Sequence, residues 1–303
     1  MSLKIEPVNE DFVAVLSGID LSKPLSRDMV EEIEQAIYKY GVLVFHDQPL
    51  TKDEQVALGE SFGPLNTGLQ TKIMNRIQTR LGDSRLSDIS NVDEKDQTAD
   101  INHRQTMVNV GNMFWHTDAA YEHRPWRYGI LAAQTAVSWG GHTQFADLRA
   151  AYDALDDRTK ELIKDKTAVF YSHQTRLSLG IEDTESDYTA FPPVRWPMVR
   201  VHPESGRVVL WVDSKVIEIS GMSIPEGRAL AHELLEHITQ RERVYSHAWK
   251  PNDVVMWDNR SVLHRGRRFD LTERREMRRI STIDDSESLG ETSLEITQRV
   301  FHT

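Results

Sequence analysis

The sequence predicts a mixed, mainly β fold, with a double-sheet jelly-roll core and helical insertions. Beyond residue 109, short apolar runs alternate with turn signals such as Gly140-Gly141 and Pro251-Asn252-Asp253, a pattern typical of many short antiparallel strands. Two helical stretches, 148–166 and 225–240, interrupt these strands. The 303 residues contain no internal repeat, so we expect residues 1–303 to form a single functional domain.

The N-terminal part is expected to alternate strands and helices. Apolar runs at 12–16 and 42–45 predict short strands, and the helical period of 29–40 predicts a helix between them. Thr51 and Glu54 have capping-box spacing, which predicts a helix through Phe62.

A polar, aperiodic stretch follows at 82–104 and predicts a loop. We place a candidate lid over the site within 66–110.

Composition excludes several classes of protein. There are 47 Asp and Glu against 36 Lys and Arg, a formal net charge of -11, which disfavours a nucleic-acid partner. No stretch reaches the roughly 18 to 20 apolar residues that span a bilayer, and the N-terminus lacks a signal-peptide core. We therefore expect a cytoplasmic protein without membrane contact. Because cysteine is absent, any metal must be held by His, Asp or Glu.

One histidine and one aspartate stand out as a metal motif. His116 and Asp118 are two residues apart, so in a strand both side chains point to the same face. His264 is the best third ligand, because it ends what reads as a buried hairpin, 253–264. Two imidazoles and one carboxylate suit non-haem Fe(II) with open positions, although zinc hydrolases use the same ligand types.

A second histidine pair is a decoy. His232 and His237 are five residues apart, about 140° around a helix, and cannot share one metal ion. The segment is interpreted as a solvated amphipathic helix.

An arginine-rich segment follows the third histidine. Seven arginines lie between 265 and 279, which as a bare run could be a nucleic-acid patch or a solvated face. In a strand, Arg275 and Arg279 would point to one side, which is either an arginine-rich surface or the cavity that holds the metal. A buried guanidinium requires an anion, and its planar fork fits a carboxylate.

Together these segments resemble the taurine dioxygenase and 2,4-dichlorophenoxyacetate dioxygenase family of Fe(II)- and 2-oxoglutarate-dependent oxygenases. The resemblance covers nearly the whole chain. Its strongest parts are Gly41-Val42-Leu43-Val44-Phe45, Phe62-Gly63-Pro64-Leu65, Trp115-His116-Thr117-Asp118, Gly140-Gly141-His142-Thr143, Met256-Trp257-Asp258-Asn259-Arg260 and the strand from Arg274 to Arg279.

The resemblance implies a double-stranded β-helix and assigns roles by position. His116, Asp118 and His264 correspond to the iron ligands, with the iron centre itself as the catalytic group and no separate acid or base. Arg275, helped by the Thr143 hydroxyl, corresponds to the partner of the distal 2-oxoglutarate carboxylate, and Arg279 to the arginine near the proximal carboxylate of 2-oxoglutarate and the acid group of the substrate. Asn112 and Trp257 correspond to positions lining the site and are assigned to 2-oxoglutarate binding. O2 is the second cosubstrate, and a homo-oligomer is expected by analogy.

Segments 87–92, 147–155 and 264–268 resemble the aryloxyacetate-degrading enzymes more than the taurine enzyme. The implied substrate is a small carboxylic acid such as 2,4-dichlorophenoxyacetate, hydroxylated with ether cleavage to a phenol and glyoxylate. A taurine, alkylsulfonate or sulfate-ester dioxygenase is the alternative within the family. Outside it, a zinc hydrolase with the same triad or a metal-free jelly-roll binding module stays open.

Overall fold

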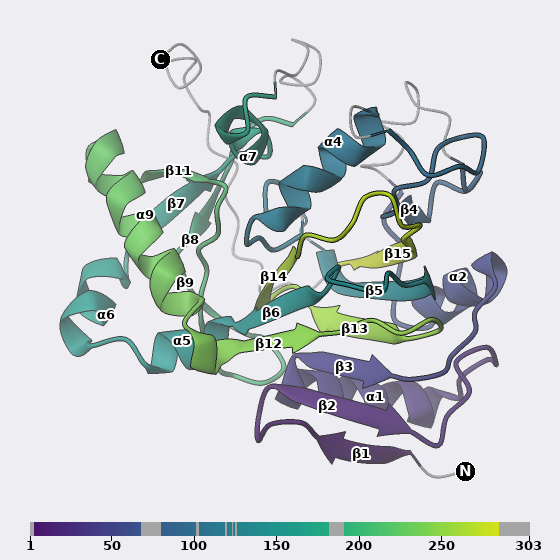
Figure 1. Cartoon of the computed structure of the whole chain (residues 1–303). Helices are drawn as coiled ribbons and strands as arrows, with labels where there is room; N and C mark the ends of the chain where they lie inside the picture. The colour runs from purple at the N-terminus through teal and green to yellow at the C-terminus, as the bar shows by residue number, and fades with distance from the viewer. Residues whose placement is uncertain are drawn as a thin grey trace.

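The computed structural model describes residues 3–67, 80–100, 103–118, 120–122, 124, 126–181 and 191–284. Strands dominate these residues, and helices cover their outer faces (Figure 1). The strands are β1 (Lys4–Pro7), β2 (Val13–Ser17), β3 (Val42–Phe45), β4 (Ser87–Asp88), β5 (Trp126–Thr135), β6 (Thr143–Asp147), β7 (Thr167–Phe170), β8 (Val194–Pro197), β9 (Val199–Val201), β10 (Val208–Leu210), β11 (Val216–Ile219), β12 (Val244–His247), β13 (Val254–Asp258), β14 (Val262–Gly266) and β15 (Glu276–Ile283).

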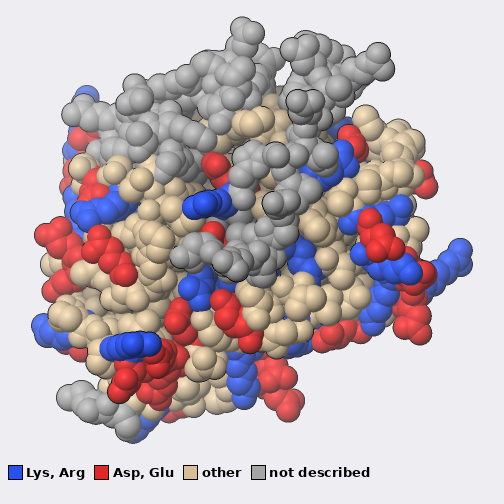
Figure 2. All heavy atoms as spheres, turned by 180° about the vertical axis from the view of Figure 1, so that it is seen from behind, with Lys and Arg blue, Asp and Glu red and all other residues tan. Residues whose placement is uncertain are grey.

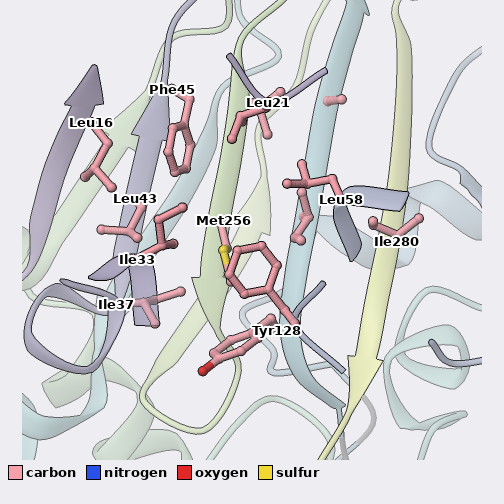
Figure 3. Close-up of a cluster of buried hydrophobic side chains, with 14 of the residues drawn as sticks. Leu16, Leu21, Ile33, Ile37, Leu43, Phe45, Leu58, Tyr128, Met256 and Ile280 are labelled. Atoms are coloured by element: carbon pink, nitrogen blue, oxygen red, sulfur yellow. The ribbon is translucent and has the colours of Figure 1, made fainter. Parts of the chain in front are cut away.

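A seven-stranded sheet, in the order β1-β2-β3-β13-β5-β15-β4, forms the largest layer. Its central strands alternate between two faces, because successive side chains of a strand point to opposite sides. Leu43, Phe45 and Met256 face the helix α1 (Arg27–Tyr40), where Ile33 and Ile37 meet them (Figure 3). Side chains on the opposite face of the sheet pack into a second core, which includes Val42, Val44, Leu131, Val255, Trp257 and Met277.

A three-stranded sheet, in the order β12-β6-β14, faces that second core. Phe145 of β6 and Val262 of β14 belong to the same cluster as the inward side chains of the large sheet. Two packed sheets enclosing one core form a jelly-roll barrel, so the predicted fold class is confirmed.

The predicted hairpin before His264 is wrong. β13 pairs with β3 and β5 in the large sheet, whereas β14 pairs with β6 in the small one. The buried corner between them is closed by Asp258, whose carboxylate accepts hydrogen bonds from the backbone N–H and the guanidinium of Arg260. The chain crosses from one sheet to the other here, and this crossing places His264 between the sheets.

The remaining helices are α2 (Lys52–Glu60), α4 (Arg104–Val110), α5 (Leu148–Asp153), α6 (Asp157–Ile163), α7 (Gln174–Ser178) and α9 (Ile224–Ile238), with 3-10 turns η1 (Gly111–Met113) and η2 (Arg241–Arg243). The capping box of Thr51 and Glu54 is present. The single helix predicted over 148–166 is wrong, since Asp156 caps a second helix by accepting from the Thr159 N–H. His232 and His237 lie on α9, where His237 meets the Ala151 carbonyl.

The loop predicted for 82–104 is partly wrong. β4 pairs with β15, and the N–H groups of Ile89 and Asn91 donate to the carbonyls of Met277 and Arg275. A two-residue strand is too short to show a period in the sequence. Within the candidate lid, residues 68–79 and 101–102 lie outside the described part.

The described surface carries both signs of charge. On the face in Figure 2, Lys and Arg side chains lie among Asp and Glu side chains. None of the described helices is long and apolar enough to cross a membrane.

Candidate metal centre

The two predicted histidine ligands are joined through their backbones. An isolated antiparallel bridge pairs His116 with His264, with N–H to O distances of 3.0 and 2.8 Å. Because paired residues of antiparallel strands project to the same side, the two imidazole centroids lie 4.3 Å apart. His116 Nδ1 lies 2.7 Å from the Phe114 carbonyl, which leaves Nε2 free to face the cavity.

Asp118 completes the cluster. One carboxylate oxygen lies 3.9 Å from His116 Nε2, and the other lies 3.7 Å from His264 Nε2. His116, Asp118 and His264 are all buried and form the one group among the described residues whose ligand atoms could hold a metal ion. The predicted triad is thus brought together, although His116 forms an isolated bridge and not part of a regular strand.

Asn259 and Asp213 hold the loop that carries these ligands. The side-chain oxygen of Asn259 accepts from the Asp118 N–H at 3.3 Å, and its carbonyl accepts from the Thr117 hydroxyl at 2.6 Å. Asp213 accepts from the Thr117 N–H at 3.3 Å. These bonds fix the backbone between the two ligands, a support that metal-binding side chains commonly require.

The electrostatic environment keeps both imidazoles neutral. Burial is the main reason that the pKa of His116 and of His264 lies well below 6.5. Nearby cations act in the same direction, Lys215 on His116 and Arg279 on His264. A neutral imidazole is the form that binds a metal ion.

Arg279 contacts the triad directly. Its Nη1 lies 2.9 Å from both carboxylate oxygens of Asp118, and its guanidinium lies 4.9 Å from the Trp126 ring centroid. The sequence placed Arg279 near a substrate acid group, but it did not reveal this ion pair.

A cavity of about 990 Å³, mouth included, opens beside the triad. Residues of α4 line it, and its walls contain the predicted residues Asn112, Thr143, Trp257, Arg275 and Arg279. Apolar wall residues are Ile89, Val110, Met113, Leu131, Phe269 and Leu271.

Arg275 is a buried cation without a carboxylate partner among the described residues. It is 8% exposed, and within the described part of the chain its guanidinium donates only to the carbonyls of Ile89 and Gly141, both at 3.2 Å. Burial alone lowers the pKa of Arg275 to about 10. An unpaired buried charge is costly, so this side of the cavity fits the carboxylate of a ligand.

The other predicted residues are already engaged by protein partners. The Trp257 indole donates to Asn259 Oδ1 at 2.8 Å, and Thr143 Oγ1 accepts from Trp249 at 2.9 Å. Asn112 makes a weak contact with Asn109 at 3.5 Å.

Sequence reasoning missed a buried pair behind the triad, Asp213 and Lys215, whose charged atoms lie 3.6 Å apart. Nothing in the local pattern singled them out. Asn259 could have been found, since it lies inside the 256–260 motif.

Comparison with known proteins identifies the family. The model of the "Taurine catabolism dioxygenase TauD, TfdA family" matches residues 4–281. The chain belongs to this family. This TauD/TfdA member is 42% identical over 287 residues to an alpha-ketoglutarate-dependent 2,4-dichlorophenoxyacetate dioxygenase of Cupriavidus pinatubonensis, covering 94% of this chain and 99% of that protein. It is 32% identical to an (S)-phenoxypropionate/alpha-ketoglutarate-dioxygenase of Sphingobium herbicidovorans, covering 90% of this chain and 92% of that protein.

A solved structure agrees. The crystal structure of AAD-2 in complex with Mn(II) and N-oxalylglycine matches with a TM-score of 0.87 and 39% identity, covering 96% of this chain and 100% of that one. The predicted family, the jelly-roll fold and a dioxygenase dependent on alpha-ketoglutarate (2-oxoglutarate) are confirmed. The zinc-hydrolase and binding-module alternatives receive no support from these comparisons.

Proposed function

We propose that this TauD/TfdA member is an Fe(II)- and 2-oxoglutarate-dependent dioxygenase that acts on an aryloxyalkanoate such as 2,4-dichlorophenoxyacetate. The observation that carries the proposal is the pairing of a His/Asp/His cluster with Arg275, a buried guanidinium lacking a carboxylate in the described residues, in the wall of one cavity.

The residues divide the work between metal, cosubstrate and substrate. His116, Asp118 and His264 would hold Fe(II), which together with 2-oxoglutarate and O2 supplies the oxidation of a C–H bond. Arg275 and the Thr143 hydroxyl would bind the distal carboxylate of 2-oxoglutarate. Arg279 holds the Asp118 carboxylate in place and would present its remaining N–H groups toward the acid group of the substrate.

An aromatic acid fits the remaining wall chemistry. Val110, Met113, Phe269 and Leu271 offer apolar surface to a ring. The relatives at 42% and 32% identity are named for 2,4-dichlorophenoxyacetate and (S)-phenoxypropionate, both of which combine an aromatic ring with a carboxylate. Hydroxylation of the carbon beside the ether oxygen would release a phenol and, from an acetate, glyoxylate.

The test is O2 consumption by the Fe(II)-loaded protein with ascorbate and 2-oxoglutarate, with 2,4-dichlorophenoxyacetate compared against taurine and a sulfate ester. Succinate and phenol released in equal amounts support the proposal. Sulfite or sulfate released with succinate would move the substrate to the sulfur compounds. Absence of turnover dependent on iron and 2-oxoglutarate across a wider panel of acids would refute it.

Three further expectations accompany this proposal. A single domain is supported by the match of one family model from residue 4 to residue 281. Cytoplasmic location rests on the absence of a membrane-spanning helix among the described residues, and a homo-oligomer rests on family analogy alone. Gel filtration of the purified protein would test the last.

A further inference from the structure

Trp249 contacts the cosubstrate side of the cavity from behind. It follows β12, and its indole N–H donates to Thr143 Oγ1 at 2.9 Å. Thr143 is the first residue of β6, is 4% exposed and lines the cavity with Arg275. Trp249 is absent from the lining residues, so an effect on a ligand would pass through Thr143.

The direction of this hydrogen bond determines where the threonine proton goes. An indole N–H is only a donor, whereas a hydroxyl carries one proton and two lone pairs. Thr143 Oγ1 therefore accepts from Trp249 and keeps its own proton for another acceptor. No protein acceptor for that proton occurs among the described residues, and the hydroxyl borders the cavity.

Arg275 presents further donors to the same space. A guanidinium carries five N–H groups, and those of Arg275 with protein acceptors point to the Ile89 and Gly141 carbonyls. The remaining N–H groups and the Thr143 proton together form a site for an anion with several acceptors, which describes a carboxylate.

The orientation of Trp249 is itself fixed. The ring of His247 meets the Trp249 ring edge-on, with centroids 4.5 Å apart and an interplanar angle of 87°. His247 Nε2 lies 3.1 Å from a carboxylate oxygen of buried Asp253, which also accepts from the Lys250 N–H. The His247 side chain and the Lys250 backbone, which flank Trp249 in the chain, are thus both held by one aspartate.

We propose that Trp249 is a positioning residue for 2-oxoglutarate: its indole N–H occupies a lone pair of Thr143 and so directs the threonine proton toward the distal carboxylate. This inference rests on the proposed function, since it assumes that 2-oxoglutarate occupies the cavity. Removing the indole N–H while keeping the ring should leave the hydroxyl free to rotate, and should weaken cosubstrate binding without a change at the metal.

The experiment measures the Kd of N-oxalylglycine and of 2-oxoglutarate for Mn(II)-loaded protein by calorimetry without O2. Trp249→Phe is expected to raise both Kd values by about tenfold, since the bond it disrupts orients a hydroxyl toward a charged acceptor. The Kd of Mn(II) should stay within about twofold. Trp139→Phe, at a tryptophan that is 70% exposed, is the matched control and should change neither Kd.

A double-mutant cycle separates positioning from packing. Thr143→Val removes the hydroxyl, so adding Trp249→Phe to it should cause no further loss of affinity. If Trp249→Phe folds poorly, β-(3-benzothienyl)alanine at position 249 replaces the N–H by sulfur in a ring of nearly the same shape, and the same tenfold loss is expected.

The outcomes distinguish the two levels of the proposal. A tenfold loss that disappears in the Thr143→Val background supports the positioning role. An unchanged Kd in Trp249→Phe, or a loss that persists undiminished in the Thr143→Val background, overturns it while leaving the proposed function intact. If the Mn(II)-loaded wild-type protein binds neither compound, the proposed function fails and this inference fails with it.

Discussion

Replacing Arg275 by glutamine should separate stability from cosubstrate binding. Burial lowers the pKa of Arg275 to about 10, against an ordinary value of about 12.5, which corresponds to roughly 3 kcal/mol of unfavourable burial in the ligand-free protein. Removing the charge relieves this cost. It also removes donors to the Ile89 and Gly141 carbonyls, at about 1 to 3 kcal/mol. The two effects offset each other.

We therefore expect the free energy of unfolding of metal-free Arg275→Gln to lie within about 1 kcal/mol of the wild-type value. Binding of 2-oxoglutarate should fall much more, because two charge-assisted hydrogen bonds at about 1.5 to 3 kcal/mol each correspond to at least about a 100-fold rise in Kd. Denaturant unfolding of the metal-free protein and calorimetry of the Mn(II)-loaded protein measure the two quantities.

The neighbouring arginine supplies the control. Arg274 pairs with Asp96 and Glu276 at 2.7 Å and is absent from the cavity lining, so Arg274→Gln removes the same charge without touching the cavity. Its Kd for 2-oxoglutarate should stay near the wild-type value. A Kd for Arg275→Gln within tenfold of wild type, or an equal loss in Arg274→Gln, would refute the assignment of Arg275.

Three other changes test the metal centre. Asp118→Ala should abolish measurable Mn(II) binding by calorimetry, since it removes the only carboxylate of the cluster; retained affinity would contradict the ligand set. Asn259→Ala should raise the Kd of Mn(II) by about 10- to 100-fold. The Asp118 N–H loses its side-chain acceptor, and the Asn259 carbonyl that accepts from the Thr117 hydroxyl is no longer held by its own side chain. An unchanged Kd would show that the ligand loop needs no such support. Burial depresses the pKa values of His116 and His264, so below about pH 6.5 the unfolded chain takes up protons that the folded protein does not. The free energy of unfolding of the metal-free protein should therefore fall as the pH drops below that point. Unfolding curves at several pH values should give a shallower fall for the His116→Gln/His264→Gln double variant, and equal slopes would contradict the depressed pKa values.

The sequence was sufficient for the residues whose side chains follow a local period. Arg279 lies in β15 and Arg275 directly precedes this strand; both line the cavity, as the alternation of strand residues predicted. Thr51 and Glu54 cap α2 because their spacing matches one helical turn. These predictions need only neighbouring residues in the chain.

Contacts between distant segments were not predictable in the same way. The bridge between His116 and His264 joins segments 148 positions apart, and the hydrogen bond from Trp249 to Thr143 joins residues 106 positions apart. The segment 253–264 has the apolar pattern of a hairpin, but local pattern does not say which sheet each arm joins. The local pattern nominated His264 as the third ligand through a hairpin that the structure does not contain, whereas the family resemblance carries the topology with it and so placed His264 beside His116 for the right reason.

The charges around the triad favour an acidic substrate for a reason that does not depend on which substrates the relatives take. Among the described residues near the metal site, the cations held out of solvent are Arg275, Arg279 and Lys215, and Asp118 and Asp213 are the carboxylates that face them. Arg267 and Arg268 also line the cavity, but both are exposed, so solvent screens their charges. The groups held out of solvent therefore leave one positive charge uncompensated, and a divalent metal ion raises this excess to three. Doubly charged 2-oxoglutarate reduces it to one, so a monoanionic substrate would bring the buried site to neutrality. Because a net charge in a poorly solvated cavity is costly, the same balance predicts that the amide of an aryloxyacetate, with the ring kept and the charge removed, binds more weakly than the acid; equal affinity would contradict it.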